Sequence, residues 1–130
     1  MNYVQDWSKY APYFTRNELA CKHTGQCEMT EETMDALLKV RIEYGKPMRI
    51  TSGYRSTKHP IEAKKAFPGE HTHGECVDVG VYGENAVQLM NIAMKHGFTR
   101  IGVSQKGDMN ARFLHLGRSR SYPNPTVWSY

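Results

Sequence analysis

The feature that most constrains the fold of this chain is the alternation in the stretch CVDVGV, residues 76–81. Valines occupy every second position, and Asp78 stands between two of them. Successive side chains of a β-strand point to opposite faces, so the valines share one face while Asp78 lies on the other with Cys76. We therefore predict a strand whose valine face packs on a core and whose other face carries a carboxylate.

A second stretch, FLHLG at residues 113–117, alternates in the same way. Its leucines are expected to face the core, which places His115 on the opposite face. His71 lies seven residues before Asp78, in a glycine-flanked turn that can bring its imidazole over the strand. Two imidazoles and one carboxylate form a common catalytic zinc set, because three protein ligands leave the fourth zinc position open for water. The spacing alone leaves open both a zinc site and the ordinary alternative of hydrogen-bonded or solvated side chains.

The remaining pattern predicts one α+β domain over residues 1–130, with a small, mostly antiparallel sheet and helices packed on one face. Caps and apolar spacing predict two longer helices and two short ones, at residues 30–44, 85–96, 15–21 and 59–66. Further strands are expected at residues 47–51, 98–104 and 111–117. Residues 118–130 contain two prolines and no periodicity, so we expect an extended tail whose aromatic side chains dock on the domain.

Composition places the chain among soluble globular domains, with 39% hydrophobic and 23% charged residues. We expect no membrane insertion, because no apolar run approaches about 18 residues. The N-terminus lacks the pattern of a secretory signal, so we expect synthesis in the cytoplasm. The net charge of +4 is compatible with a solvated basic surface or with an anionic partner such as a cell wall, and the basic residues form no run of five.

The three cysteines are too few for a disulfide framework, and reduced thiols are the simplest expectation. Cys21, His23 and Cys27 leave two alternatives open, a second zinc site or a disulfide, although the set lacks a fourth zinc ligand.

Four ordered motifs give the chain a resemblance to a known family. ITSGYRS, the HxxGxxxD pattern in HTHGECVD, GFTRIGV and FLHLG are similar in order and spacing to motifs of the zinc D-Ala-D-Ala peptidases. That family includes D,D-carboxypeptidases, D,D-dipeptidases and many bacteriophage endolysins, and hedgehog signalling domains share its scaffold. The similarity runs from about Phe14 to Leu116.

The resemblance implies roles for five residues. His71, Asp78 and His115 fall on the family's zinc ligands. Arg55 falls on the arginine that holds the scissile carbonyl and its developing oxyanion, although an ion pair that pins the turn is its ordinary alternative. Ser52 is expected to brace the turn or a zinc-binding side chain.

The general base is where this chain departs from the family pattern. Several branches carry an acid three residues before the last histidine, where this chain has Arg112, and other relatives carry one just after it, where this chain has Gly117 and Arg118. A water-activating peptidase needs an acceptor within hydrogen-bond reach of the water. Asp108 is our first candidate, followed by Glu75, Glu70 and His73.

The function implied is a monomeric zinc peptidase that hydrolyses a bond in peptidoglycan stem peptides, as a D,D-carboxypeptidase or an endopeptidase. An endolysin of a bacteriophage, acting on the cell wall after release, fits the absence of a signal. The missing base motivates an alternative from another class, a non-catalytic, zinc-stabilised binding module of a virion or cell-wall protein. A metal-dependent nuclease is the least favoured reading, and we expect no nucleic-acid partner.

Overall fold

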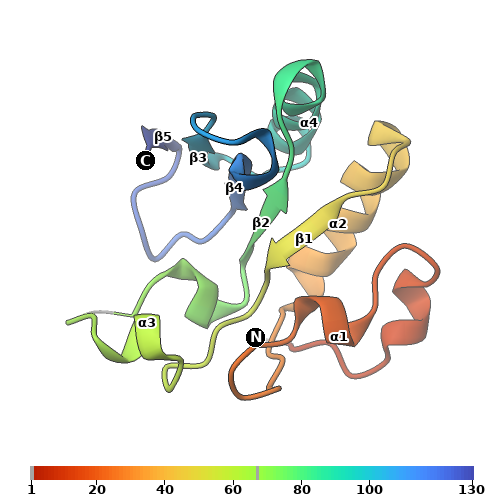
Figure 1. The fold of residues 1–130 in the computed structure, drawn as a ribbon. Helices are drawn as coiled ribbons and strands as arrows, with labels where there is room; N and C mark the ends of the chain where they lie inside the picture. The colour runs from red at the N-terminus through yellow and green to blue at the C-terminus, as the bar shows by residue number, and fades with distance from the viewer. Residues whose placement is uncertain (1, 67) are drawn as a thin grey trace.

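The sheet of this protein determines where its site lies. The structure is a computed structural model that describes residues 2–66 and 68–130. Within them, five strands form one sheet in the order β1-β2-β4-β3-β5 (Figure 1). Neighbouring strands are antiparallel except for β3 and β5, which run parallel. The strands are β1 (Arg49–Ser52), β2 (Cys76–Gly80), β3 (Arg100–Ser104), β4 (Phe113–Gly117) and β5 (Thr126–Ser129).

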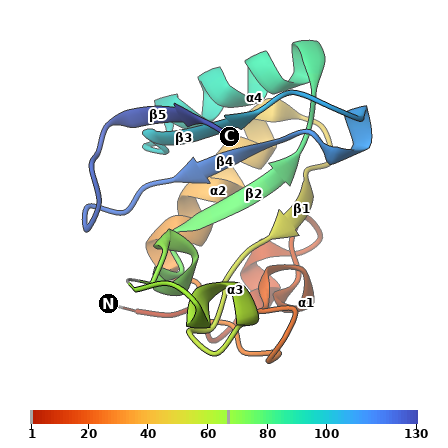
Figure 2. The ribbon, with the colours of Figure 1, turned by 60° about the vertical axis from the view of Figure 1, so that its left-hand side comes forward.

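Two long helices, α2 (Glu31–Tyr44) and α4 (Gly83–Lys95), cover one face of the sheet, as Figure 2 shows behind the strands. The predicted caps of α2 are confirmed: the Thr30 hydroxyl accepts from the Thr33 amide, and Gly45 ends the helix with a positive φ of 71°. The shorter elements are α1 (Arg16–Leu19), α3 (Pro60–Ala63) and the 3-10 turns η1 (Trp7–Tyr10), η2 (Glu70–His73) and η3 (Met109–Ala111). No helix in the described ranges has the length and apolar character needed to cross a membrane.

The core between the sheet and the helices is built from the strand faces that the alternation predicts. Val77, Val79, Leu114 and Leu116 are all at most 1% exposed. Burial of such a side chain contributes roughly 1.5–3 kcal/mol. A slip of one residue in β2 or β4 would turn these side chains to the other face of the sheet, so burial fixes the register and with it the identity of the residues on that other face.

The fold agrees with the predicted class, a small α+β domain with a mostly antiparallel sheet and helices on one face. The tail differs from the expectation in one respect, because residues 126–129 are not merely extended but form β5 beside β3. The pairing joins segments more than twenty residues apart, and a four-residue strand stabilised by such a partner has little signal of its own.

Candidate metal centre

Asp78 and His115 meet because β2 and β4 are neighbours in register. The two residues are directly opposite each other in the antiparallel ladder. Both lie on the face of the sheet that points away from α2 and α4, and both are buried. His115 Nδ1 is 3.0 Å from Asp78 Oδ1. The prediction from strand alternation thus corresponds to a direct contact.

His71 reaches the same place from η2, just before β2. The turn that follows it depends on Gly74, which has a φ of 67°, and a Cβ at this position would lie 1.8 Å from the carbonyl oxygen of Glu28. No other residue fits there without displacing the backbone. His71 Nε2 is 3.3 Å from Asp78 Oδ2, so the structure brings the three predicted zinc ligands together.

The hydrogen bonds of the two histidines leave one nitrogen of each directed at Asp78. His71 Nδ1 lies 2.7 Å from the carbonyl oxygen of Gly53, and His115 Nε2 lies 2.7 Å from Glu70 Oε1. Both partners only accept, so these nitrogens carry protons. The remaining nitrogens, His71 Nε2 and His115 Nδ1, both face the Asp78 carboxylate, where each can carry a proton and donate to the carboxylate or share a cation with it. Two imidazoles with one carboxylate are a set of donors that suits Zn²⁺.

The charges of the site agree with a cation between these groups. Burial alone would raise the pKa of Asp78, but hydrogen bonds from His115 and His71 hold it well below its ordinary value. Burial alone would lower the pKa of His115, but its bonds to Asp78 and Glu70 raise it. The carboxylate is therefore ionised, and its surroundings favour positive charge.

Cys76 lies on the same face of β2 as Asp78 and is a competing ligand candidate. His71, Cys76 and His115 offer donor atoms that all lie within 4.8 Å of one another. Among the residues that the structure describes, this is the one group of three potential metal donors. Burial raises the pKa of the Cys76 thiol well above its ordinary value, which keeps it neutral. Asp78 stays the predicted third ligand, and its ionised oxygens lie 3.0 Å from His115 Nδ1 and 3.3 Å from His71 Nε2.

Glu70, one of the candidate bases from the sequence, is a hydrogen-bond partner of the predicted ligand His115. Its buried carboxylate accepts from His115 Nε2, from Arg100 Nε at 3.0 Å and from the Ser119 amide at 2.9 Å. It occupies the space beside Gly117, where a Cβ would lie 2.3 Å from Glu70 Oε1. Glu70 thus holds His115 from the side that faces away from Asp78. A carboxylate that accepts from the outer nitrogen of a ligating histidine fixes the ring's orientation and tautomer.

Arg55 is fixed beside the predicted ligands. Its Nε donates to Ser52 Oγ at 3.1 Å, its Nη1 pairs with Glu62 Oε2 at 3.3 Å, and its Nη2 lies 3.8 Å from Asp78 Oδ2. The Glu62 side chain is fully buried and also accepts from the Gly69 amide at 2.8 Å. Ser52 therefore braces the guanidinium, and the ion pair that pins the turn coexists with a position facing the site.

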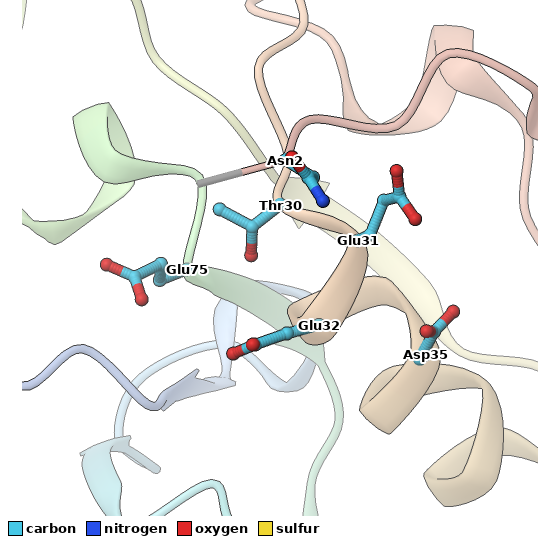
Figure 3. Close-up of a pocket in the computed structure, with 6 residues that line it drawn as sticks. All are labelled: Asn2, Thr30, Glu31, Glu32, Asp35 and Glu75. Atoms are coloured by element: carbon cyan, nitrogen blue, oxygen red, sulfur yellow. The ribbon is translucent and has the colours of Figure 1, made fainter.

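The structure does not bring Asp108 to the three predicted ligands. The exposed Asp108 carboxylate accepts from the Asn110 amide at 2.8 Å and caps η3, and its role as a base stays a prediction. Glu75 lies in a separate hollow of about 440 Å³, together with acids of the first turns of α2 (Figure 3). His73 Nε2 lies 3.1 Å from the Tyr122 hydroxyl.

A cavity of about 250 Å³ opens over the predicted ligands. Three cationic side chains line it, Arg55, Lys65 and Arg100. Gly69, Glu70 and three aromatic side chains, Phe113, Trp128 and Tyr130, also line it. Each of the three cations is paired with a carboxylate, Arg55 and Lys65 with Glu62 and Arg100 with Glu70. The arrangement suits a small polar ligand held next to a metal ion.

Cys21, His23 and Cys27 form neither the disulfide nor the second zinc site that the sequence left open. Cys21 and Cys27 are both free, with Cys21 buried and Cys27 partly buried. Across residues 2–66 and 68–130, neither is part of a group of three potential metal donors.

Comparison with known proteins adds an independent finding. A family model described as Peptidase M15 matches residues 12–117, which include Arg55, the three predicted ligands and Glu70. A search of curated proteins finds no match. The tail from residue 118 onward lies outside the matched region. Since the match covers most of the chain, and the motifs and site geometry agree with it, the protein belongs to the peptidase M15 family, the zinc D-Ala-D-Ala carboxypeptidases.

Proposed function

We propose that the protein is a zinc-dependent peptidase that hydrolyses a peptide bond in bacterial peptidoglycan stem peptides. The observation that carries the proposal is the convergence of His71 Nε2, His115 Nδ1 and the Asp78 carboxylate at one end of a cavity that also holds Arg55. Membership of the M15 family supports peptidase activity, and the bond and substrate are our proposal.

Zinc in this position would polarise the scissile carbonyl and lower the pKa of its bound water. The chain's own residues supply orientation and charge. Gly53 and Glu70 hold the two imidazoles so that one nitrogen of each stays available to the metal. Arg55 donates to the carbonyl oxygen as negative charge grows on it, and Ser52 and Glu62 hold the guanidinium in place beforehand.

The size of the cavity supports the proposed substrate class. About 250 Å³ accommodates a residue or two of peptide rather than a folded chain, and the charged and polar side chains that line it suit a polar stem peptide. The net charge of +4 would favour approach to an anionic cell wall. Both a D,D-carboxypeptidase and an endopeptidase of the endolysin type fit these features.

One observation favours the alternative, a non-catalytic zinc-stabilised binding module. In the described part of the chain, the carboxylates that line the cavity are Asp78 and Glu70. Asp78 is a predicted ligand, and Glu70 is engaged by three donors on the side of His115 that faces away from Asp78. A peptidase of this kind needs an acceptor for the proton of the attacking water.

Purified muropeptides, incubated with the zinc-loaded protein and analysed by mass spectrometry, test the proposal. We expect new amine and carboxyl ends from the wild type. Arg55→Ala should lose about 100-fold or more in turnover while still binding zinc, as expected for one oxyanion donor. It should also lower the free energy of unfolding, because the buried Glu62 carboxylate loses one ion-pair partner. Arg41→Ala is the matched control, because Arg41 lies on α2 across the core. Muropeptides that bind but stay intact would refute the peptidase and support the binding module.

A further inference from the structure

The row of residues that forms the site continues into the tail, beyond the region that the family model matches. Ser52 of β1 pairs with Asp78 of β2, Asp78 with His115 of β4, and His115 with Gly102 of β3. Gly102 in turn pairs with Trp128 of β5. One row across the sheet therefore contains the serine that braces Arg55, two predicted zinc ligands, a glycine and a tryptophan.

Gly102 makes room for Trp128 to reach the metal centre. The centroids of the Trp128 and His115 rings are 5.0 Å apart, with 54° between their planes. A Cβ on Gly102 would lie 2.7 Å from the indole ring. Any side chain at this position would thus stand between Trp128 and His115.

Tyr130 extends the same surface. It is two residues beyond Trp128, its ring centroid is 5.0 Å from that of Phe113, and it is half exposed. Its amide donates to the carbonyl oxygen of Val103, so the end of the chain is attached to the sheet. Both Trp128 and Tyr130 line the cavity over the predicted ligands, and we call these two residues the aromatic wall.

A cation links the aromatic wall to the ligands from a second side. The Arg100 guanidinium lies 5.1 Å from the ring centroid of Trp128 and 5.1 Å from that of Tyr122, another residue of the tail. The same guanidinium donates to Glu70, which holds His115. Trp128 is thus held in a defined position, which is what a surface needs in order to discriminate between ligands.

We propose that the aromatic wall determines substrate specificity by packing against the peptide residue next to the cleaved bond and limiting the size of its side chain. The inference rests on the proposed function and extends it to residues outside the family match. Because the cavity is only about 250 Å³ and the wall is attached to the sheet, a bulky side chain against its rings leaves less room for the rest of the peptide than a small aliphatic one.

Kinetics on two stem-peptide analogues test the wall, one with alanine next to the cleaved bond and one with leucine at that position. For the wild type we expect a higher kcat/KM with alanine. Trp128→Ala should reduce this preference about tenfold, mainly through KM, with little change in zinc affinity. Gly102→Ala should act in the same direction, because its methyl group displaces the indole without removing it. Val127→Ala is the matched control, since Val127 lies on the same strand, faces away and is 67% exposed.

Fluorescence gives a readout that does not depend on turnover. The chain has two tryptophans, so Trp7→Phe leaves Trp128 as the only indole. Addition of a stem pentapeptide ending in D-alanyl-D-alanine should shift the emission of this variant, and the additional Gly102→Ala change should reduce the shift.

The outcomes separate the inference from the proposed function. Cleavage with an unchanged alanine preference in both Trp128→Ala and Gly102→Ala overturns the wall and leaves the peptidase intact. A shift in Trp128 emission without cleavage refutes the peptidase and supports the wall as a peptide-binding surface. If Trp128→Ala does not fold, Trp128→Phe and Gly102→Ala still decide the question, and a lack of both shift and cleavage overturns both proposals.

Discussion

Replacement of Glu70 by glutamine tests how the ring of His115 is held. The Glu70 carboxylate accepts from three donors, His115 Nε2, Arg100 Nε and the Ser119 amide, at 2.7 to 3.0 Å. A glutamine side chain has the same shape but only one accepting oxygen. Its amide nitrogen would therefore face a donor in a buried place, and Arg100 would lose its charged partner.

The size of the effect follows from these contacts. A buried donor left without an acceptor costs about 1–3 kcal/mol, so we expect the free energy of unfolding of the metal-free protein to fall by that amount. Loss of the carboxylate that orients a ligating histidine typically weakens metal binding about 10–100-fold. We expect a rise of this size in the zinc Kd, which corresponds to roughly 1.4–2.7 kcal/mol.

Competition with a chromophoric chelator measures zinc affinity, and urea unfolding measures stability. Glu75→Gln is the matched control, since Glu75 is partly buried, lies five residues further on and lines the hollow away from the cavity. It should change stability by no more than about 0.5 kcal/mol and leave the zinc Kd unaltered. If Glu70→Gln binds zinc as tightly as Glu75→Gln, then Glu70 does not position His115 and the reasoning is wrong.

Four further outcomes are expected. Gly117→Ala should weaken zinc binding as Glu70→Gln does and add little in the double variant, because its Cβ would displace the Glu70 carboxylate. Asp108→Asn should keep turnover within about threefold, since its carboxylate caps η3, whereas a loss of about 100-fold or more would identify it as the base. Chelation should lower the melting temperature, and zinc at 100 times its Kd should restore about 2.7 kcal/mol. Burial alone would raise the pKa of Asp35, but hydrogen bonds from Tyr10 and Lys9 lower it below its ordinary value. The contribution of these bonds to folding stability is therefore present at neutral pH and is lost as pH falls through the folded-state pKa of Asp35. Tyr10→Phe should therefore cost about 1 kcal/mol in unfolding free energy at pH 7 and less at pH 3.

The sequence was sufficient to predict which side chains lie on the face of the sheet that carries the site, because strand alternation is a local property. Val77 and Leu116 are buried in the core, and that alone places Asp78 and His115 on the opposite face. The sequence could not show that β2 and β4 are neighbours in register. The resemblance to a family with two ligands at these positions supplied that part.

The hydrogen-bond partners of the predicted ligands were harder to predict, because they come together only in the folded sheet. Glu70 is adjacent to His71 in the chain, yet its carboxylate contacts His115, Arg100 and the start of the tail. From the sequence it ranked among candidate bases. Asp108, the first candidate, is close to β4 in sequence, but its carboxylate is engaged in a local cap.

Two glycines in strands could have indicated these partners. Gly102 is the cross-strand neighbour of His115, and Gly117 follows His115 on the same face of β4. A glycine inside a strand weakens it, and its presence often marks a place where another group approaches closely. Here the indole of Trp128 fills the space beside Gly102, and the carboxylate of Glu70 fills the space beside Gly117. Trp128 of β5 and Glu70 of η2 thus reach His115 because its neighbours in the sheet, Gly102 and Gly117, have no side chains. The two glycines are therefore as much a part of the site as Trp128 and Glu70.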